Sequence, residues 1–211
     1  MNRPDKKLAL LGASGHGKVV ADMAMALEWT EVVFFDDAWP AVACNGQWPV
    51  VGDSAGLLKR LHEFDGVVIA IGNCAIRLRK QNEFAAMGAR IATIVHPRAW
   101  VSPYARLGAG TVVMAGAIIN TDAKIGTACI INTGATVDHD CEIANGVHIA
   151  PGAHLSGNVR VGDLSWIGVG AAVRQGIEIG ASVMAGAGAV VVKAIEDNAT
   201  VVGNPAAPLK K

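Results

Sequence analysis

The sequence predicts two different architectures in series, a small α/β domain over residues 1–97 and a parallel β-solenoid over residues 98–211. Strand-like and helix-like patterns alternate up to about residue 95, which is typical of a small parallel sheet with helices. From Val101 onward the apolar pattern changes and repeats every six residues, and a fixed short period is the signature of a solenoid.

Short apolar runs separated by helical patterns define the α/β part. The predicted strands cover 8–12, 31–35, 66–72 and 90–95. The predicted helices run from the Gly-rich turn to about Glu28, around 54–62, and over 75–87. Between them, residues 38–52 hold two prolines and two glycines and are expected to be irregular. The fold is therefore predicted as Rossmann-like, with His96 and Pro97 at its end.

Sixteen hexapeptides follow one another over residues 101–196 without an insertion, and the first position is Val, Ile or Leu in 15 of them, with Ala185 the exception. Three hexapeptides close one coil of about 18 residues, so the first-position side chains should stack inside a prism. The fifth position is small or aliphatic and should fill the corners. Cys129 and Cys141 fall on fifth positions, which predicts buried small hydrophobes rather than metal ligands.

The composition narrows the class of protein. The chain is 52% hydrophobic, which argues against a disordered protein. Its formal net charge is zero, so it lacks the excess of basic residues that is typical of a nucleic-acid-binding protein. No apolar run is long enough for a membrane span, and the first residues lack the pattern of a signal peptide. The four cysteines show no CxxC spacing and are typical of free thiols in a reducing cytoplasm.

His139 is the strongest candidate for a general base, because histidine titrates near neutral pH. It stands between Asp138 and Asp140, and its neighbours one coil away are Thr121 and Gly157. These small neighbours predict open space for a substrate over the imidazole. The side chains of Asp140 and His139 can meet only at a corner, because adjacent residues on a straight strand point to opposite faces. A solvated polar turn explains the same residues equally well.

The Gly-rich turn from Gly12 to Lys18 follows a strand and opens a helix, an arrangement that favours phosphate binding. Asp36 lies 19 residues past Gly17, where a dinucleotide fold places its ribose-binding acid, so an NAD-dependent enzyme is an alternative. The small size of the domain and the absence of a following hydride-transfer domain weigh against NAD.

Three segments carry a resemblance to a known family: GASGHGKVVAD (12–22), IGNC with the later arginine (71–77), and TVDHDCEIANGVHIAPGAHLSGN (136–158). With the hexapeptides, they make the chain resemble the sugar-nucleotide acetyltransferases of the left-handed β-helix type, which include UDP-N-acetylbacillosamine N-acetyltransferases and sialic-acid O-acetyltransferases. The resemblance covers nearly the whole chain. This chain departs from the family at Cys74, where members often have a second Asn after Asn73.

The resemblance implies transfer of an acetyl group from acetyl-CoA to a nucleotide sugar in bacterial glycan or glycoprotein biosynthesis. The first expectation for the acceptor is the 4-amino group of a UDP-4-amino-4,6-dideoxy-N-acetylhexosamine, and sialic-acid-type O-acetylation is the alternative. It also implies a homotrimer with the acyl-CoA site between neighbouring solenoids, in the cytoplasm, without a metal. His139 would be the base, and Asp140 would orient it.

The family's binding residues carry over to particular positions. The nucleotide sugar would be held by Ser14, Gly15, His16, Gly17, Asp36, Asp37, Gly72, Asn73 and Asn132. Acetyl-CoA would be held by His148, Gly168, Val169, Gly186 and Ala187. Trp166 lies one coil beyond His148, so a stacked His–Trp pair is an equal alternative there. The tail 201–209 resembles the closing motif that borders the CoA nucleotide.

Two further classes of protein are open alternatives. A zinc carbonic anhydrase solenoid needs three convergent histidines, and His148 and His154 are one hexapeptide apart, hence on adjacent faces. A non-catalytic scaffold with a nucleotide-sensing domain would show no thioester turnover.

Overall fold

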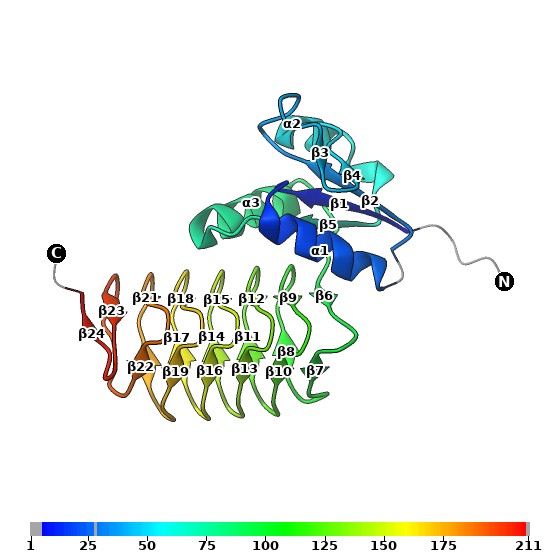
Figure 1. The fold of residues 1–211 in the computed structure, drawn as a ribbon. Helices are drawn as coiled ribbons and strands as arrows, with labels where there is room; N and C mark the ends of the chain where they lie inside the picture. Colours follow the sequence, from blue (N-terminus) through cyan, green and yellow to red (C-terminus); the bar gives the residue numbers. More distant parts are fainter. Residues whose placement is uncertain (1–5, 28, 210–211) are drawn as a thin grey trace. The chain divides into compact units, whose positions relative to one another are not determined.

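The computed structural model describes residues 6–27 and 29–209, and the chain divides into two units, Met1–Pro97 and Arg98–Lys211 (Figure 1). We call them the α/β unit and the solenoid and describe each by itself.

The α/β unit is built on three parallel strands in the order β2-β1-β5. These strands are β1 (Lys7–Leu11), β2 (Glu31–Phe35) and β5 (Gly66–Ile69). The helices are α1 (Gly15–Met25), α2 (Ser54–Lys59), the 3-10 helix η1 (Leu61–Glu63) and α3 (Cys74–Ala86). The irregular segment holds a short hairpin of β3 (Cys44–Asn45) and β4 (Trp48–Pro49), and β6 (Ile94–Val95) ends the unit.

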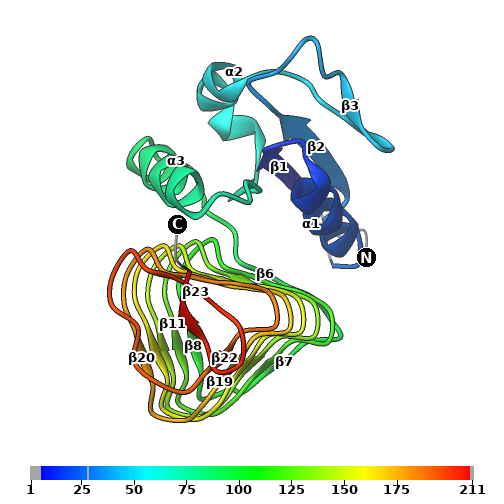
Figure 2. The ribbon, with the colours of Figure 1, turned by 60° about the vertical axis from the view of Figure 1, so that its left-hand side comes forward.

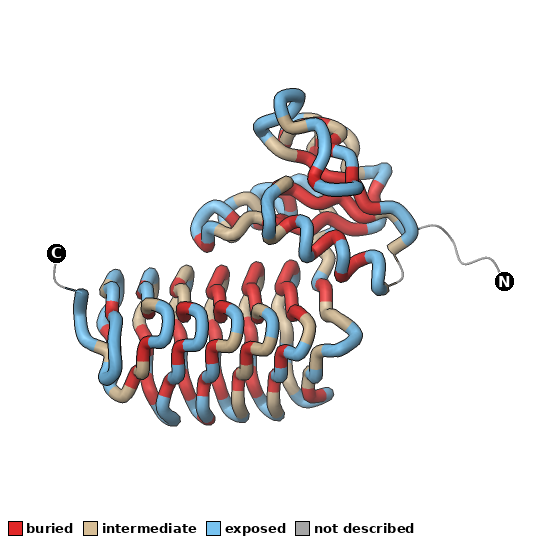
Figure 3. The backbone as a smooth tube through the Cα atoms, in the orientation of Figure 1, coloured by how far each residue is buried: buried red, intermediate tan, exposed pale blue. Residues whose placement is uncertain are grey.

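The three strands are buried because both faces of a parallel sheet are covered by other elements (Figure 3). One core cluster joins Leu11, Phe35 and Ile69 from the strands to Phe84 of α3. The carboxyl ends of the strands, and with them the loops that carry the predicted binding residues, are thereby fixed at one edge of the sheet.

Two predictions for this unit need correction. The fourth strand, predicted over 90–95, is an isolated bridge between Ile91 and Val67 followed by the two-residue β6. Ile94 is buried, as its apolar character requires, although it does not pair with the β2-β1-β5 sheet. The helix predicted around 54–62 is divided into α2 and η1. Glu28, the predicted end of the first helix, lies outside the described residues, and α1 ends at Met25.

The hexapeptides form a parallel β-helix with a triangular cross-section (Figure 2). Each strand joins the sixth residue of one hexapeptide, which points outward, to the first residue of the next, which points inward. Ile119 and Val137 are fully buried first-position residues, and Cys129 and Cys141 are fully buried at fifth positions. The predicted interior stacking is therefore confirmed.

Three sheets form the faces of the prism. The first face consists of β7 (Trp100–Val101), β10 (Ile118–Ile119), β13 (Thr136–Val137), β16 (His154–Leu155), β19 (Ala172–Val173) and β22 (Val190–Val191). The second face consists of β8 (Arg106–Leu107), β11 (Lys124–Ile125), β14 (Glu142–Ile143), β17 (Arg160–Val161) and β20 (Glu178–Ile179). The third face includes β9 (Val112–Val113), β12 (Ile130–Ile131), β15 (His148–Ile149), β18 (Trp166–Ile167), β21 (Met184–Ala185), β23 (Thr200–Val202) and β24 (Ala207–Pro208).

Two columns of turns matter for function. Corner A joins the first face to the second and comprises 102–104, 120–122, 138–140, 156–158 and 174–176. Corner B joins the third face to the first and comprises 114–116, 132–134, 150–152, 168–170 and 186–188.

The repeat ends earlier than predicted. Ile179 pairs with Ile195, and Met184 pairs with Thr200, so the last coil advances by 16 residues instead of 18. Ile195, assigned by sequence to a fifth position, thus aligns with a first-position residue. A buried aliphatic at either position gives the same pattern, so hydrophobicity alone could not reveal the shift.

No helix in the described ranges is both long and apolar enough to cross a membrane. All four cysteines are free thiols, and three of them are buried.

Candidate active site

His139 stands at corner A beside a carboxylate. Asp140 has a φ of 59°, in the left-handed region, and occupies the turn after β13. The turn directs both side chains to the same side, and His139 Nδ1 lies 2.7 Å from Asp140 Oδ2. The geometric condition that the sequence sets for an Asp140–His139 pair, namely a corner, is therefore met.

A second carboxylate holds the backbone of this turn. Asp138 Oδ1 accepts hydrogen bonds from Asn120 Nδ2 and from the backbone N–H of His139, each at 2.8 Å. These bonds, that of Asn120 first, lower the pKa of Asp138, so it carries a negative charge. No role was expected for Asp138 or Asn120 from the sequence, although Asn120 lies one coil before Asp138 in the same column.

The electrostatics of the turn suit a proton acceptor. The pKa of His139 is raised, first by its hydrogen bond to Asp140 and then by the charge of Asp138. Because the Asp140 carboxylate accepts the proton on Nδ1, the lone pair of the neutral imidazole is on Nε2. Nε2 can therefore take a proton from a substrate.

Gly157 corrects one prediction. The missing side chain at 157 was expected to leave room for substrate, but the imidazole itself fills that room. A Cβ on Gly157 would lie 2.6 Å from Cε1 and 2.7 Å from Nε2 of His139. Gly157 is thus the surface against which the His139 ring rests.

A cavity of about 600 Å³ lies beside His139 at the start of the solenoid. Its lining residues come from the turn of His139 and from the two preceding coils. They are Trp100, Ser102, Pro103, Tyr104, Asn120, Thr121, Asp138 and His139. The open side of the base therefore faces the preceding coils.

His148 has a different environment on the third face. It is 6% exposed, and its ring packs against Trp166 with 4.0 Å between ring centroids and an interplanar angle of 50°, so the predicted His–Trp pair is present but tilted rather than stacked. Asn132 Oδ1 accepts from the backbone N–H of Thr133, which turns Asn132 Nδ2 toward His148 Nε2 at 3.0 Å. Nε2 of His148 is therefore a hydrogen-bond acceptor in this pair.

The four remaining residues expected at acetyl-CoA lie at corner B in later coils. Gly168 is required by packing, since a Cβ there would lie 2.5 Å from the carbonyl oxygen of Ala185. Gly186 likewise packs against Val202. Val169 and Ala187 are exposed and lie one coil apart on the same edge. The glycines allow close stacking of the coils, and the two exposed residues form a narrow apolar strip.

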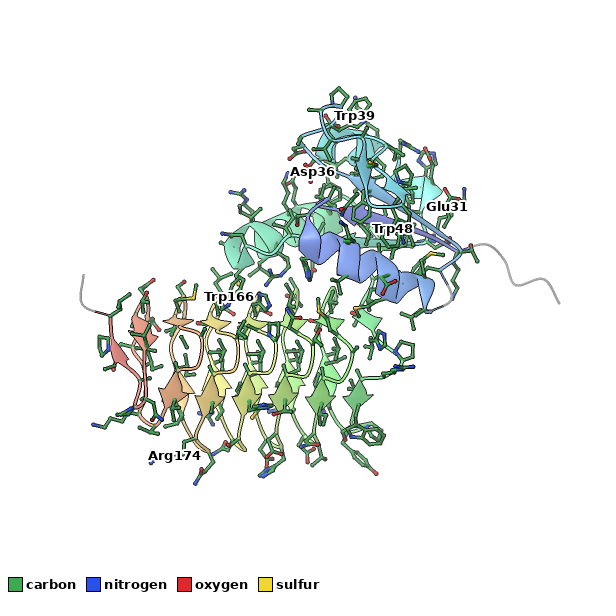
Figure 4. All side chains as sticks on the ribbon, viewed as in Figure 1. Glu31, Asp36, Trp39, Trp48, Trp166 and Arg174 are labelled. Atoms are coloured by element: carbon green, nitrogen blue, oxygen red, sulfur yellow. The ribbon has the colours of Figure 1, made fainter. Side chains whose placement is uncertain are left out.

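Corners A and B are separated by the full width of the first face. Asn132 and Asp138 are six residues apart in the chain, which corresponds to about 20 Å of extended backbone. Figure 4 places Trp166, the partner of His148, on the opposite side of the solenoid from Arg174, which belongs to corner A. Within one chain, the predicted base and the predicted acetyl-CoA residues therefore do not meet.

The α/β unit has its own cavity of about 310 Å³ at the carboxyl ends of β1, β2 and β5. Four of the predicted nucleotide-sugar residues line it, namely Ser14, Asp36, Asp37 and Gly72. Leu11, Gly12, Ser54, Ile71 and Ile76 complete the lining.

The two aspartates also hold the loops of this cavity. Asp36 accepts from the backbone N–H groups of Ala13 at 2.7 Å and Ala38 at 2.9 Å. Asp37 accepts from the backbone N–H of Ser54 at 2.9 Å, and hydrogen bonding by Ser54 is the main reason why the pKa of Asp37 is lowered. Both carboxylates are thus held in fixed positions around the cavity.

The other predicted residues of this unit do not line the cavity. Gly15 is exposed at the start of α1, and Gly17 packs against Gly12 and Phe34. Asn73 caps α3 by accepting from the backbone N–H of Ile76 at 3.0 Å. The contacts of Gly17 and Asn73 are structural.

His16 lies in the first turn of α1, and Arg77 lies in the first turn of α3. Burial, followed by the nearby charge of Arg77, lowers the pKa of His16 to about 4, so His16 is neutral near pH 7. Arg77 is 1% exposed and donates to the carbonyl oxygens of Ile71 at 2.9 Å and Gly72 at 2.8 Å. Arg77 therefore fixes the loop that supplies Gly72.

The remaining candidates are not brought together. His154 is exposed on the first face with its Nδ1 2.9 Å from Thr136 Oγ1, whereas His148 is on the third face. A hollow of about 690 Å³ on the second face has Lys124 and Glu142 in its lining, and these two charges are paired with one another at 2.8 Å. Among the residues that the structure describes, no group of three or more His, Cys, Asp or Glu could hold a metal ion.

Known sequences match this chain both as a family model and as a curated relative. The model of the PglD N-terminal domain matches residues 7–84. UDP-N-acetylbacillosamine N-acetyltransferase from Bacillus subtilis (strain 168) is 39% identical over 112 residues. That match spans 52% of this chain and 52% of the Bacillus protein, about half the length of each.

Solved structures match over nearly the whole chain. The acetyltransferase domain of PglB from Neisseria gonorrhoeae FA1090, in complex with acetyl coenzyme A, is 47% identical with a TM-score of 0.93, over 97% of this chain and 100% of that chain. A variant of perosamine N-acetyltransferase from Caulobacter crescentus, in complex with CoA and GDP-perosamine, is 38% identical with a TM-score of 0.93, over 97% of each chain.

Proposed function

Because the chain belongs to the family of β-helix sugar-nucleotide N-acetyltransferases, we propose that it transfers the acetyl group of acetyl-CoA to an amino group of a nucleotide-activated sugar. The first candidate acceptor is the 4-amino group of a UDP-4-amino-4,6-dideoxy-N-acetylhexosamine. The observation that carries the proposal is the His139–Asp140 pair, with Nδ1 bonded to the carboxylate at 2.7 Å beside an open cavity.

The chemistry follows from this pair. His139 Nε2 accepts a proton from the acceptor amine as the nitrogen attacks the thioester carbonyl carbon, and Asp140 stabilises the resulting imidazolium. Collapse of the tetrahedral adduct breaks the carbon–sulfur bond, and His139 returns the proton to the thiolate of CoA. The products are the N-acetylated sugar nucleotide and free CoA, and His139 is neutral again.

The α/β unit supplies the nucleotide site in this proposal. The cavity bounded by Ser14 and Gly72 lies beside the start of α1, where backbone N–H groups favour a diphosphate. Asp36 and Asp37 are held in place to accept hydrogen bonds from a ribose or base. The unit has three strands in its parallel sheet, which is one mononucleotide half, so a nucleotide sugar fits it better than NAD.

A trimer completes the active site. His139 at corner A and the Asn132–His148 pair are about 20 Å apart along the first face, so one acetyl group cannot touch both sets in one chain. A closed ring of three copies would bring corner A of one solenoid to corner B of the next. Light scattering is expected to give three chains per particle, and a monomer at assay concentration would contradict the trimer.

Mixing one variant of each corner tests the shared site more sharply, at an acetyl-CoA concentration below the wild-type KM. His139→Ala removes the base, and Asn132→Ala with His148→Ala damages the other corner. If each site takes one corner from each of two copies, subunit exchange between these two proteins should restore part of the activity. Mixtures whose activity stays at the average of the two separate proteins, after exchange is shown by mass, would contradict a shared site.

Thiol release from acetyl-CoA tests the reaction itself. We expect free CoA in the presence of a UDP-4-amino sugar and a new amide in the product by mass spectrometry, with GDP-, CMP- and hydroxyl-only sugars as comparison acceptors. No release with any acceptor would contradict the enzyme proposal and favour a scaffold. UDP should raise the melting temperature of the full chain, whereas NAD should not.

We place the reaction in the cytoplasm. All four cysteines are free, which suits a reducing compartment.

A further inference from the structure

The cavity beside His139 has an aromatic wall that the fold does not need. Trp100 is 60% exposed and Tyr104 is 73% exposed, although large aromatic side chains usually bury most of their surface. Both line the same cavity as His139. Ile118, the strand neighbour of Trp100 on the first face, does not line it.

The position of Tyr104 is fixed by its turn. Ser102 Oγ accepts from the backbone N–H of Tyr104 at 3.2 Å, and Pro103 stands between them. Trp100 is fixed through its backbone N–H, which donates to Ala117 at 2.9 Å. The backbone that carries the two rings is therefore anchored in the first coil of the solenoid before any ligand arrives.

The opposite side of the cavity is polar and carries charge. Asn120 and Thr121 present an amide and a hydroxyl, and Asp138 is ionised through its bonds to Asn120 and to the backbone of His139. Among the described residues, the lining holds no Lys or Arg to neutralise that carboxylate. The cavity therefore offers an apolar wall, a polar wall and one negative charge beside a base.

A deoxy-amino-pyranose has matching surfaces. One face of a sugar ring is a set of C–H groups that packs on aromatic rings, its edges carry hydroxyl groups, and an amine near neutral pH is partly an ammonium ion that a carboxylate attracts. Since the His139 ring rests on Gly157 of the following coil, its open side faces this cavity.

We propose that this cavity is the subsite for the acceptor sugar ring and that Trp100 and Tyr104 are specificity-determining residues that pack on its apolar face, with Asp138 drawing in its amino group. This inference rests on the proposed function and adds residues to it. A second copy of the chain covering the two rings is the competing occupant, and it is an outcome of the test.

The test measures steady-state kinetics of the full-length enzyme with both substrates varied. Trp100→Ala should raise the KM for the amino-sugar nucleotide about tenfold, the loss expected for one aromatic contact, while the KM for acetyl-CoA stays unchanged. Trp100→Phe should restore most of the affinity. Tyr104→Ala should act in the same direction, and the double variant should lose more than either. Asp138→Asn should raise the KM for the amine further as the pH falls.

Ile118→Ala is the matched control, because it removes an exposed apolar side chain from the next strand of the same face. It should change neither KM. Light scattering of each variant shows whether the acceptor sugar or a second copy of the chain occupies the cavity. A loss of the assembled state in Trp100→Ala or Tyr104→Ala would overturn the inference in favour of a subunit contact.

Unchanged acceptor KM values in both aromatic variants would also overturn the inference while leaving the proposed function intact. The proposed function would fail in a different way, through absence of turnover by the wild-type enzyme.

Discussion

Two histidines on the same solenoid, nine residues apart in the chain, differ in almost every property that matters for chemistry. His139 is at a corner, exposed, bonded to a carboxylate and resting on a glycine. His148 is on a flat face, buried, packed against Trp166 and hydrogen-bonded to an asparagine amide. The first is arranged to exchange a proton, and the second is arranged to stay in one place.

The difference teaches how a solenoid builds a site. A side chain on a strand lies between the side chains at the same position of the two neighbouring strands. The surroundings of His148 are therefore set by Ile130 and Trp166. A corner position is free of the ladder, and its backbone can place two adjacent side chains together, as Asp140 does with a φ of 59°. Proton transfer is therefore expected at the corner, and orientation of the donor at the face.

Removal of the corner base is the strongest way to break this comparison. His139→Ala should lower kcat by roughly 10²–10⁴-fold, the usual contribution of a general base. Acetyl-CoA affinity and melting temperature should stay close to wild type because His139 is exposed. His154→Ala, another exposed solenoid histidine, is the control and should keep full activity. A loss below tenfold in His139→Ala would remove His139 from the mechanism.

Displacement of the same ring, without changing it, gives the second largest effect. Gly157→Ala would put a methyl group where the imidazole lies, and a shift of about 1 Å in a catalytic group costs about 100-fold in rate. In the His139→Ala background the same substitution has no ring to displace and should cost neither activity nor stability. Wild-type kcat in Gly157→Ala would show that the ring does not need this support.

The carboxylate partner sets the pH at which the base works. Asp140→Asn removes the main cause of the raised pKa of His139, so the acidic limb of the kcat/KM profile should move to lower pH. The direction follows because a raised pKa keeps His139 protonated, and inactive as a base, up to a higher pH. At the optimum, the rate should fall about tenfold through the lost charge-assisted hydrogen bond. An acidic limb that stays at the wild-type pH would show that Asp140 does not set the pKa of His139.

The buried histidine should give the smallest effect and a different signature. His148→Ala should raise the KM for acetyl-CoA about fivefold, in line with one lost hydrogen bond of about 1 kcal/mol, and leave the acidic limb unmoved. Asn132→Ala should have a similar effect, and the double variant should be less than additive because the two side chains share one contact. A shifted acidic limb in His148→Ala would erase the distinction between the two histidines.

The α/β unit was harder to predict than the solenoid. The strands at Lys7–Leu11 and Gly66–Ile69 follow from their apolar runs, but the predicted fourth strand joins their sheet only through a bridge at Ile91. A run of apolar residues reports burial, whereas a strand also needs a neighbour that offers hydrogen bonds along its length. The solenoid avoids this ambiguity because each coil supplies the next with the same partner.

The sequence by itself determined the two architectures, the change of period at Val101, the interior and exterior positions of the hexapeptides, and His139 and Asp140 as a candidate pair. Those features are periodic or local, so a linear pattern contains them. Only the tertiary structure decided that Gly157 supports the imidazole, that Asn120 and Asp138 hold its turn, that Trp100 and Tyr104 face the same cavity, and that His148 lies on a different side of the prism. These contacts join residues 18 or more positions apart, or separate residues close in sequence, and they depend on how the coils stack and where the chain turns.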